Sequence, residues 1–213
     1  MAIKKIVKIW DDGEISNSNI EFLKLKTKKV TFPLSPFINQ IIQDLIDTYE
    51  TITCAGIAAN QIGYEYQIFI GMKEIKTEDE AEEIEKKEAE LSSASGNPYA
   101  DNYEIYINPQ IDLTNNKSTK IDEEGCLSIP GLMVERKRFD EIKVRYYDAN
   151  GKKNKKRLSG FLSKLFQHEL DHLNGMLMID GQEKIENLYP LEASEEQAKL
   201  YGTLYSEYQK LIK

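Results

Sequence analysis

The chain has 213 residues, with 28 basic and 36 acidic side chains, a net charge of −8 and a pI near 5.0. This length fits one domain with a sizeable core, and the acidic balance argues against nucleic acid, DNA included, as a main partner. No stretch approaches the ~20 apolar residues that span a bilayer, and the N-terminus lacks the long apolar run of a signal peptide. We therefore expect a cytoplasmic protein that does not bind membranes.

The first clear element is a helix over residues 35–49. Residues 1–34 are polar and give no comparable signal. Ser35 and Pro36 are an N-cap residue and a proline at the first helical position, which is typical of a helix start. An apolar stripe follows, made of Ile38, Ile41, Ile42, Leu45, Ile46 and Tyr49. A strand is then predicted over residues 67–72.

A charged segment over residues 73–95 interrupts this pattern. Nine acidic and four basic residues lie between Lys73 and Glu90. A solvated insertion is the simplest interpretation, and we expect it either to form a helix through Glu–Lys pairs or to stay disordered. The sequence thus predicts a single domain over residues 1–213, with a charged insertion at about 73–99.

Two more strands are predicted, over residues 103–107 and 141–147. The second leads into Asp148-Ala149-Asn150-Gly151, a typical hairpin turn. Near the end of the chain, Ser194 and Gln197 form a capping box. The apolar stripe after it predicts an amphipathic helix over residues 194–212 that packs on the outside of the protein.

Between these elements lies a helix, predicted over residues 160–174, that carries the only two histidines of the chain. His168 and His172 are four residues apart, so they share one helical face at about 5–6 Å between Cβ atoms and can bind one cation. Glu169 follows the first histidine, where an H-E-x-x-H site has its general base. A chance pair on a surface helix is the alternative. The apolar flanks argue against it, because buried imidazoles need partners.

Two histidines leave a catalytic site one ligand short, because such sites usually have three protein ligands and a water. The chain has only two cysteines, too few for a disulfide framework. One of them, Cys126, lies in Glu124-Gly125-Cys126-Leu127-Ser128, which resembles the E-G-C-L-S motif of the peptide deformylase family. Residues 168–172 are similar to that family's H-E-x-D-H, and residues 56–61 to its G-φ-A-A-x-Q. The three motifs occur in the family's order, and the resemblance covers roughly residues 35–182.

The resemblance implies both a fold and a site. The fold is α+β, with mostly antiparallel strands around a central metal-binding helix, an N-terminal helix and a C-terminal helix. Cys126, as a thiolate, would join His168 and His172 as a metal ligand, and Glu169 would be the catalytic acid–base. The side-chain amide of Gln61 and the backbone N–H of Leu127 would meet the substrate oxygen that becomes negatively charged.

The implied reaction is hydrolysis of the N-formyl group from formyl-methionine at the N-terminus of nascent polypeptides, with release of formate. The cofactor is one divalent metal ion. The family implies Fe²⁺ in the cell, with Zn²⁺ or Ni²⁺ as alternatives in the isolated protein, whereas the sulfur–nitrogen donor set alone suits zinc. The expected partners are N-formylated nascent peptides, including those at the ribosome, and the chain is expected to be a monomer or a weak homo-oligomer.

Some positions bear on how closely the chain follows the family. Cys54 stands where the family has a glycine, and we expect it to be a small buried apolar residue. Lys164, one turn before His168, stands where the family has an apolar residue lining the methionine pocket. We expect its head group to bend toward solvent. Glu124 and Arg136 resemble a family ion pair that braces the cysteine loop.

These departures leave other hypotheses open. One is a deformylase-like amidase with altered substrate specificity, suggested by Lys164 and Cys54. Another is a zincin-type endoprotease, which accounts for H-E-x-x-H but leaves the motifs around Cys126 and Gln61 unexplained. A non-catalytic binding protein is disfavoured because the ligands and catalytic groups are all present.

Overall fold

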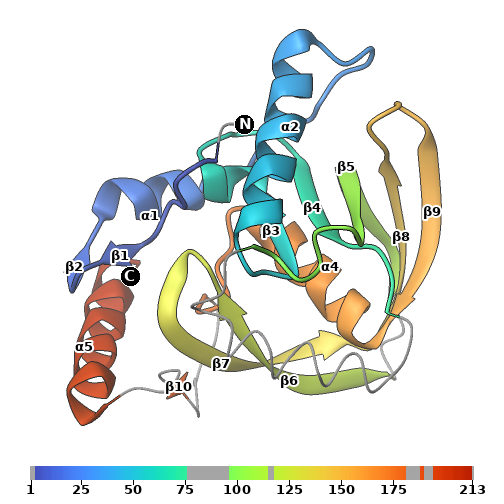
Figure 1. Ribbon diagram of the computed structural model, residues 1–213. Coiled ribbons are helices and arrows are strands. Elements are labelled where there is room, and N and C mark those ends of the chain that lie inside the picture. Colours follow the sequence, from blue (N-terminus) through green and yellow to red (C-terminus); the bar gives the residue numbers. More distant parts are fainter. Residues whose placement is uncertain (1–2, 76–95, 115–117, 181–187, 190–193, 213) are drawn as a thin grey trace.

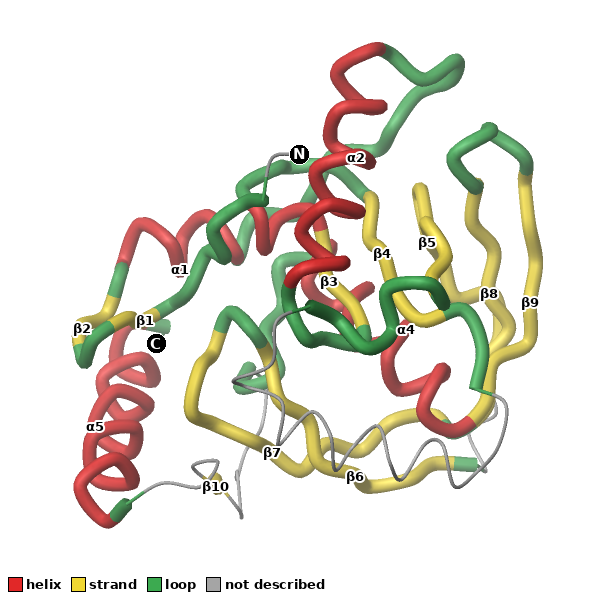
Figure 2. The backbone as a smooth tube through the Cα atoms, viewed as in Figure 1, coloured by secondary structure: helices red, strands yellow, loops and turns green. Residues whose placement is uncertain are grey.

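The computed structural model describes residues 3–75, 96–114, 118–180, 188–189 and 194–212 (Figures 1 and 2). Most of the predicted charged insertion lies outside these residues, so the single domain with an insertion stays a prediction. The last residues of this insertion, which the structure does describe, are anchored to the protein. The Asn97 side chain donates to the carbonyl oxygens of Tyr49 at 2.8 Å and Cys54 at 3.0 Å.

Two antiparallel sheets form the framework. The larger sheet has the strand order β3-β4-β5-β8-β9 and the smaller one β10-β7-β6. The larger sheet consists of β3 (Gly56–Ala58), β4 (Ile68–Met72), β5 (Tyr103–Thr114), β8 (Glu141–Tyr147) and β9 (Lys153–Ser159). The smaller sheet consists of β6 (Thr119–Cys126), β7 (Ile129–Phe139) and β10 (Leu188–Tyr189). A short hairpin of β1 (Trp10–Asp11) and β2 (Glu14–Ile15) forms a separate two-stranded sheet that contacts β7.

Helix α4 (Gly160–Leu173) lies between the two sheets (Figure 1). It contacts β3, β4, β8 and β9 of the larger sheet and β7 of the smaller one. Phe166 is 1% exposed and meets the rings of Phe69 and Tyr106 edge-on, at centroid distances of 5.3 and 5.5 Å. Such aromatic contacts fix both the depth and the rotation of a helix. The predicted α+β fold, with strands around this helix, is confirmed.

Helix α2 (Pro36–Thr51) confirms the first helix predicted from the sequence. Its N-cap is Ser35, whose hydroxyl accepts a hydrogen bond from the Ile38 N–H at 3.3 Å. The predicted apolar stripe packs in the same core cluster as Ile57 and Ile70 of the larger sheet. The helix therefore covers one side of that sheet and ends next to β3.

The C-terminal helix α5 (Glu195–Leu211) begins at the predicted capping box. Ser194 Oγ accepts from the Gln197 N–H at 3.3 Å, and Gln197 Oε1 accepts from the Ser194 N–H at 3.0 Å. Its buried face packs in one cluster with Trp10 and Leu132. The helix lies at the periphery, next to the β1–β2 hairpin (Figure 1), as predicted.

Several elements were not predicted. Helix α1 (Asn17–Leu23) and the β1–β2 hairpin lie in the polar N-terminal stretch. The 3-10 helix η1 (Ala59–Ile62) follows β3 directly. Strand β5 runs past the predicted end to Thr114, and β6, β7 and β9 are additional strands. These strands carry many charged residues, which masks the alternation of apolar side chains expected of a half-buried strand.

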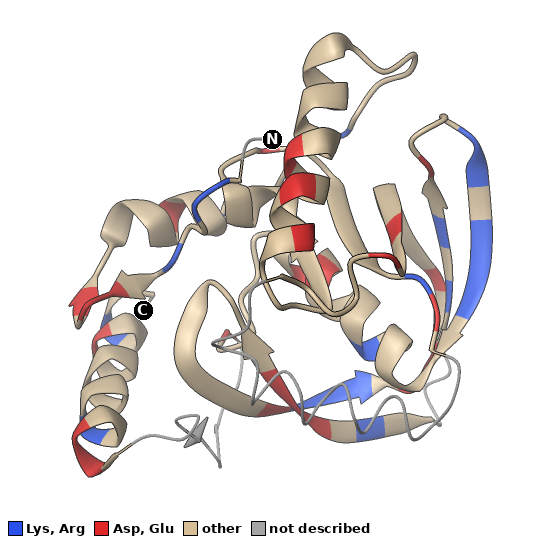
Figure 3. Ribbon diagram, viewed as in Figure 1, with Lys and Arg blue, Asp and Glu red and all other residues tan. Residues whose placement is uncertain are grey.

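Strand β9 is an edge of the larger sheet and carries a concentration of basic side chains (Figure 3). Lys153, Lys155 and Arg157 are exposed on it. Charged side chains on an edge strand oppose pairing with another chain, so this basic strand has a structural explanation. None of the helices in the described part of the chain is long and apolar enough to cross a membrane.

Candidate metal centre

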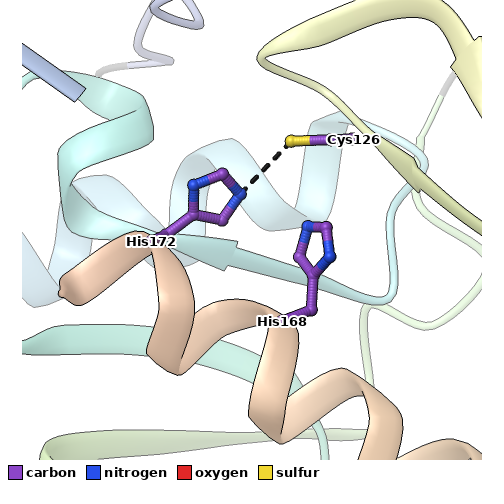
Figure 4. Close-up of side chains that lie close together, drawn as sticks. All are labelled: Cys126, His168 and His172. Atoms are coloured by element: carbon purple, nitrogen blue, oxygen red, sulfur yellow. Dashed lines mark hydrogen bonds between the residues drawn. The ribbon is translucent and has the colours of Figure 1, made fainter. Parts of the chain in front are cut away.

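Three predicted ligands lie together in the structure. One ligand atom from each of Cys126, His168 and His172 lies within 4.8 Å of the others. The Cys126 Sγ and the His172 Nε2 are 3.2 Å apart, and the two imidazole rings have centroids 4.9 Å apart (Figure 4). The sequence motifs predicted that these three side chains form one site, and in the structure they lie close together.

Two elements supply these side chains. The histidines lie one turn apart on α4, and Cys126 is the last residue of β6, at the turn into β7. Two residues of the N-terminal stretch bind that turn. The Ile9 N–H donates to the Ser128 carbonyl at 2.9 Å, and the Trp10 indole N–H donates to the Pro130 carbonyl at 2.9 Å. The cysteine is therefore fixed by the N-terminal stretch as well as by its own hairpin.

His168 is oriented by a buried carboxylate. Its Nδ1 lies 3.0 Å from Glu124 Oε2, and Arg138 binds the same carboxylate through Nε at 2.6 Å and Nη2 at 2.9 Å. Burial would raise the pKa of Glu124, but hydrogen bonds from Arg138 and His168 hold it well below its usual value. An Nδ1–H that donates to this carboxylate leaves the Nε2 lone pair available for a cation, as is usual for metal-bound histidine.

The predicted ion pair between Glu124 and Arg136 is wrong. Arg138 takes that place, and it also donates to Asp171 Oδ2 at 2.6 Å. Arg136 instead donates to the carbonyl oxygens of Leu177 at 3.2 Å and Met178 at 2.6 Å. Alternate residues of a strand point to the same face, so sequence spacing alone could not choose between the two arginines.

Arg138→Met is expected to lower the free energy of unfolding by about 3–5 kcal/mol, because it leaves the Glu124 carboxylate buried without its main partner. Both side chains are less than a tenth exposed, at 9% and 3%. Urea denaturation of the metal-free protein measures the change. Arg145→Met is a matched control, because its pair with Asp112 is 43% and 28% exposed and such pairs contribute about 0–1 kcal/mol. Equal losses in the two variants would contradict the assignment.

The donor set fits a divalent transition metal. His172 is 1% exposed, and its Nδ1 has no hydrogen-bond partner among the described residues. Burial lowers the pKa of His172 well below its usual value, so the ring is held neutral, which is the metal-binding form. One thiolate sulfur and two imidazole nitrogens form a mixed set suited to zinc, iron or nickel rather than to calcium or magnesium.

Glu169 lies beside the ligands without being one of them. Its side chain is buried, and Oε2 has no hydrogen-bond partner among the described residues. Burial raises the pKa of its carboxyl to about 7, although nearby His168 opposes the rise. A carboxyl with a pKa close to neutral can both accept and return a proton at physiological pH. The carboxylate also lies so close to β3 that a Cβ at Gly56 would be 2.7 Å from Glu169 Oε1.

Gln61 also faces the centre. Its Nε2 lies 3.6 Å from Cys126 Sγ and 3.3 Å from Ser128 Oγ, while its Oε1 accepts from the Ala58 N–H at 2.8 Å. The bond to Ala58 fixes which end of the amide is turned to the site, so Gln61 presents a donor there. Cys54 is buried, as predicted, and is not part of the metal-ligating cluster.

A cavity of about 790 Å³ opens beside the candidate metal centre. Five of the six predicted site residues line it, namely Gln61, Cys126, Leu127, His168 and Glu169. A volume of this order accommodates a small ligand or the end of a peptide. Its walls come mainly from the segment that leads into β3, the end of β6 with the start of β7, and helix α4.

Lys164 lines the same cavity, and the expectation that it bends toward solvent is wrong. Its side chain is only 12% exposed, and Nζ lies 3.2 Å from Asp122 Oδ2. The head group reaches across to β6 instead of out of the protein. The sequence could not show this, because β6 was not predicted and the position of Asp122 was therefore unknown.

Comparison with known proteins agrees with the motifs. The sequence model of the family described as polypeptide deformylase matches residues 12–187. A peptide deformylase of Elusimicrobium minutum (strain Pei191) is 35% identical over 182 residues, which are 84% of this chain and 88% of that protein. The crystal structure of peptide deformylase from Thermotoga maritima has a TM-score of 0.61 at 27% identity, and the match covers 86% of this chain and 100% of that one. That from Ehrlichia chaffeensis has a TM-score of 0.64 and covers 100% of both chains, and at 22% identity this likeness concerns the fold alone.

Proposed function

The chain belongs to the polypeptide deformylase family, and we propose that it removes the formyl group from nascent polypeptides with one metal ion held by Cys126, His168 and His172. The main support for this proposal is the geometry of the site. The ligand atoms of Cys126, His168 and His172 lie within 4.8 Å of one another, and the buried carboxylate of Glu169 lies beside them at the wall of a cavity. Neither a binding protein nor a structural protein needs a protonatable carboxylate next to a metal centre.

In the proposed amide hydrolysis, three residues would bind the metal ion and Glu169 would transfer protons. Cys126, His168 and His172 would hold a divalent ion, which would supply Lewis acidity and would lower the pKa of a water in its open position from 15.7 toward about 7. Glu169 accepts a proton from the attacking water and passes it to the amide nitrogen as the carbon–nitrogen bond breaks. The water oxygen stays on the formyl carbon, so the products are formate and a free amino terminus.

Two donors of the chain face the carbonyl oxygen in this proposal. Gln61 Nε2 and the backbone N–H of Leu127 would donate to it as it gains negative charge. Gln61 is only 2% exposed and its Oε1 is fixed by Ala58, so its donor is oriented before substrate arrives. The loss of one such donor typically costs about 2.7–4 kcal/mol of transition-state stabilisation.

Gly56→Ala is expected to lower kcat, because the added Cβ would lie 2.7 Å from Glu169 Oε1 and 2.8 Å from Leu165 Cδ1. The carboxylate must move, and a misplacement of about 1 Å can cost on the order of 10²-fold in rate. Steady-state kinetics on a formylated peptide measures the effect. Gly202→Ala is the control, because a Cβ there meets nothing within 4 Å. An unchanged kcat in Gly56→Ala would show that Glu169 is not held against β3 during turnover.

Formate release tests the proposed function directly. Purified protein is incubated with a formyl-methionyl peptide, the acetylated peptide and an unblocked peptide of the same sequence. The proposal expects formate from the first peptide and no internal cleavage of the third. Internal cleavage without formate would support the endoprotease. A preference for another acyl group or first residue would support the amidase of altered specificity.

We further propose that the native ion is Fe²⁺, with Zn²⁺ or Ni²⁺ replacing it in protein isolated in air. The support is the family together with the mixed sulfur–nitrogen donor set, which holds all three ions. Metal analysis of protein purified with and without oxygen distinguishes them. We also propose that the chain works where nascent polypeptides emerge, in the cytoplasm and at the ribosome, as a monomer or a weak homo-oligomer.

A further inference from the structure

The two histidines of the candidate metal centre are held in different ways. The ring of His168 is oriented through its Nδ1, which lies 3.0 Å from the buried Glu124 carboxylate. His172 is 1% exposed, and its Nδ1 has no hydrogen-bond partner among the described residues. A metal-bound imidazole usually has its second nitrogen fixed by such a partner. The direction of the His172 ring therefore depends on its packing and on how its backbone is held.

The backbone of His172 is held by Asn60, a residue of the 3-10 helix η1. Asn60 Nδ2 donates to the His172 carbonyl oxygen at 2.7 Å, and both residues are 1% exposed. A hydrogen bond in such a buried position is electrostatically stronger than one in water. The two residues are 112 positions apart in the chain, so this bond fixes η1 against the last turn of α4.

The 3-10 helix η1 carries a second group of the site next to Asn60. Gln61 Nε2 lies 3.6 Å from Cys126 Sγ, and His172 Nε2 lies 3.2 Å from the same sulfur. The N-terminal stretch holds η1 in turn, because the Val7 N–H donates to the Gln61 carbonyl oxygen at 2.8 Å. One short element therefore positions Gln61 directly and His172 through Asn60.

We propose that Asn60 is a positioning residue for the metal ion, which holds the backbone of His172 so that the ring Nε2 faces Cys126 Sγ. The inference rests on the proposed function in that Cys126, His168 and His172 hold a metal ion. Without the Asn60 donor, the His172 carbonyl keeps the bond from the Gly175 N–H at 3.0 Å, but the helix end loses its link to η1. Ligands that must be ordered at the moment of binding hold an ion less tightly than ligands that are already in place.

Asn60→Leu tests this role with Co²⁺ as the probe, because it removes the donor and keeps a side chain of similar size. The affinity for Co²⁺, measured by competition with a chelator, should fall about 10–100-fold, the usual effect of losing a partner that orients a metal ligand. The absorption bands of bound Co²⁺, which report the geometry of its ligands, should shift as well. Neither readout needs turnover.

Thr27→Val is the matched control, because Thr27 makes the same kind of contact one residue further along the helix. Its hydroxyl donates to the Leu173 carbonyl oxygen at 2.8 Å, and its N–H donates to the same oxygen at 3.0 Å. Thr27 is 6% exposed, so it is buried as Asn60 is. Each variant thus removes one side-chain donor from a helix-end carbonyl that keeps a backbone donor. Thr27→Val should keep the Co²⁺ affinity of the wild type, because Leu173 is not a ligand.

Urea unfolding of the metal-free variants separates positioning from stability. Both variants should lose stability to a similar extent, whereas only Asn60→Leu should lose Co²⁺ affinity. Equal Co²⁺ affinities in the two variants, or wild-type absorption bands in Asn60→Leu, would overturn the inference. If Asn60→Leu does not fold, the smaller Asn60→Ala takes its place in the same comparison. Failure of both to fold would also overturn the inference, because Asn60 would then be needed for the fold as a whole.

Formate release by the wild type separates this inference from the proposed function. If the wild type binds Co²⁺ but releases no formate from a formyl-methionyl peptide, and Asn60→Leu binds Co²⁺ more weakly, the proposed reaction fails and the role of Asn60 holds. If the wild type releases formate and Asn60→Leu binds Co²⁺ equally tightly, the inference fails and the function holds. A wild type that binds no Co²⁺ would overturn both.

Discussion

Glu169→Gln is expected to lose about 10²–10⁴-fold in kcat, the usual contribution of a general acid–base, while keeping its metal ion. The carboxylate is 2% exposed and lies against Gly56, outside the cluster formed by the three candidate ligands. Glutamine has nearly the same shape, so it keeps the packing, but its amide cannot accept and return a proton. Formate release and metal content are measured on the same preparation.

The result separates a catalytic role from a ligand role. A loss of less than tenfold would remove Glu169 from proton transfer. Loss of the metal together with activity would place Glu169 in the coordination shell. Glu123→Gln is the matched control, because Glu123 is the exposed neighbour of Asp122 on the same cavity and lies outside the metal-ligating cluster. Its effect on kcat should be far smaller than that of Glu169→Gln.

Cys126→Ala is expected to lose metal binding and, with it, nearly all activity. A ligand removed from a three-residue site should cost more than the roughly 10–100-fold in metal affinity that follows loss of an outer-shell partner. Cys126→Asp supplies an oxygen donor in its place, so it should retain part of the metal with changed geometry. Metal content after dialysis against a weak chelator measures both variants.

Cys54→Ala is the control for Cys126, because Cys54 is buried 
away from the metal-ligating cluster. It should keep the metal ion and lose only packing stability. Metal loss in Cys54→Ala with retention in Cys126→Ala would contradict the site altogether. Metal loss in both would point to unfolding, and circular dichroism of each variant distinguishes unfolding from ligand loss.

The helices could be predicted because their signals are local. Ser35 and Pro36 determine where α2 begins, and Ser194 with Gln197 determines where α5 begins. Helix α4 was predicted to within one residue of its observed end, since its apolar spacing persists up to Leu173. His168 and His172 share a face of any helix, so their meeting follows from spacing alone.

The strands that complete the site could not be predicted in the same way. Strand β6 is mostly exposed and highly charged, yet it carries Cys126, Glu124 and Asp122. Its position beside α4 is set by long-range pairing with β7, which no local pattern reveals. For this reason the sequence predicted that Lys164 would bend toward solvent and that Arg136, rather than Arg138, would bind Glu124.

In the proposed reaction, one metal ion held by Cys126, His168 and His172, with Glu169 beside it, is required for hydrolysis of formylated peptides. Titration of Fe²⁺ without oxygen into metal-free protein, with formate release from a formyl-methionyl peptide as the readout, tests this requirement. Activity should rise linearly and saturate at one ion per chain, and Glu169→Gln should bind the same single ion without comparable release. Saturated binding of the ion with no formate from the wild type would show that this site does not carry out the reaction.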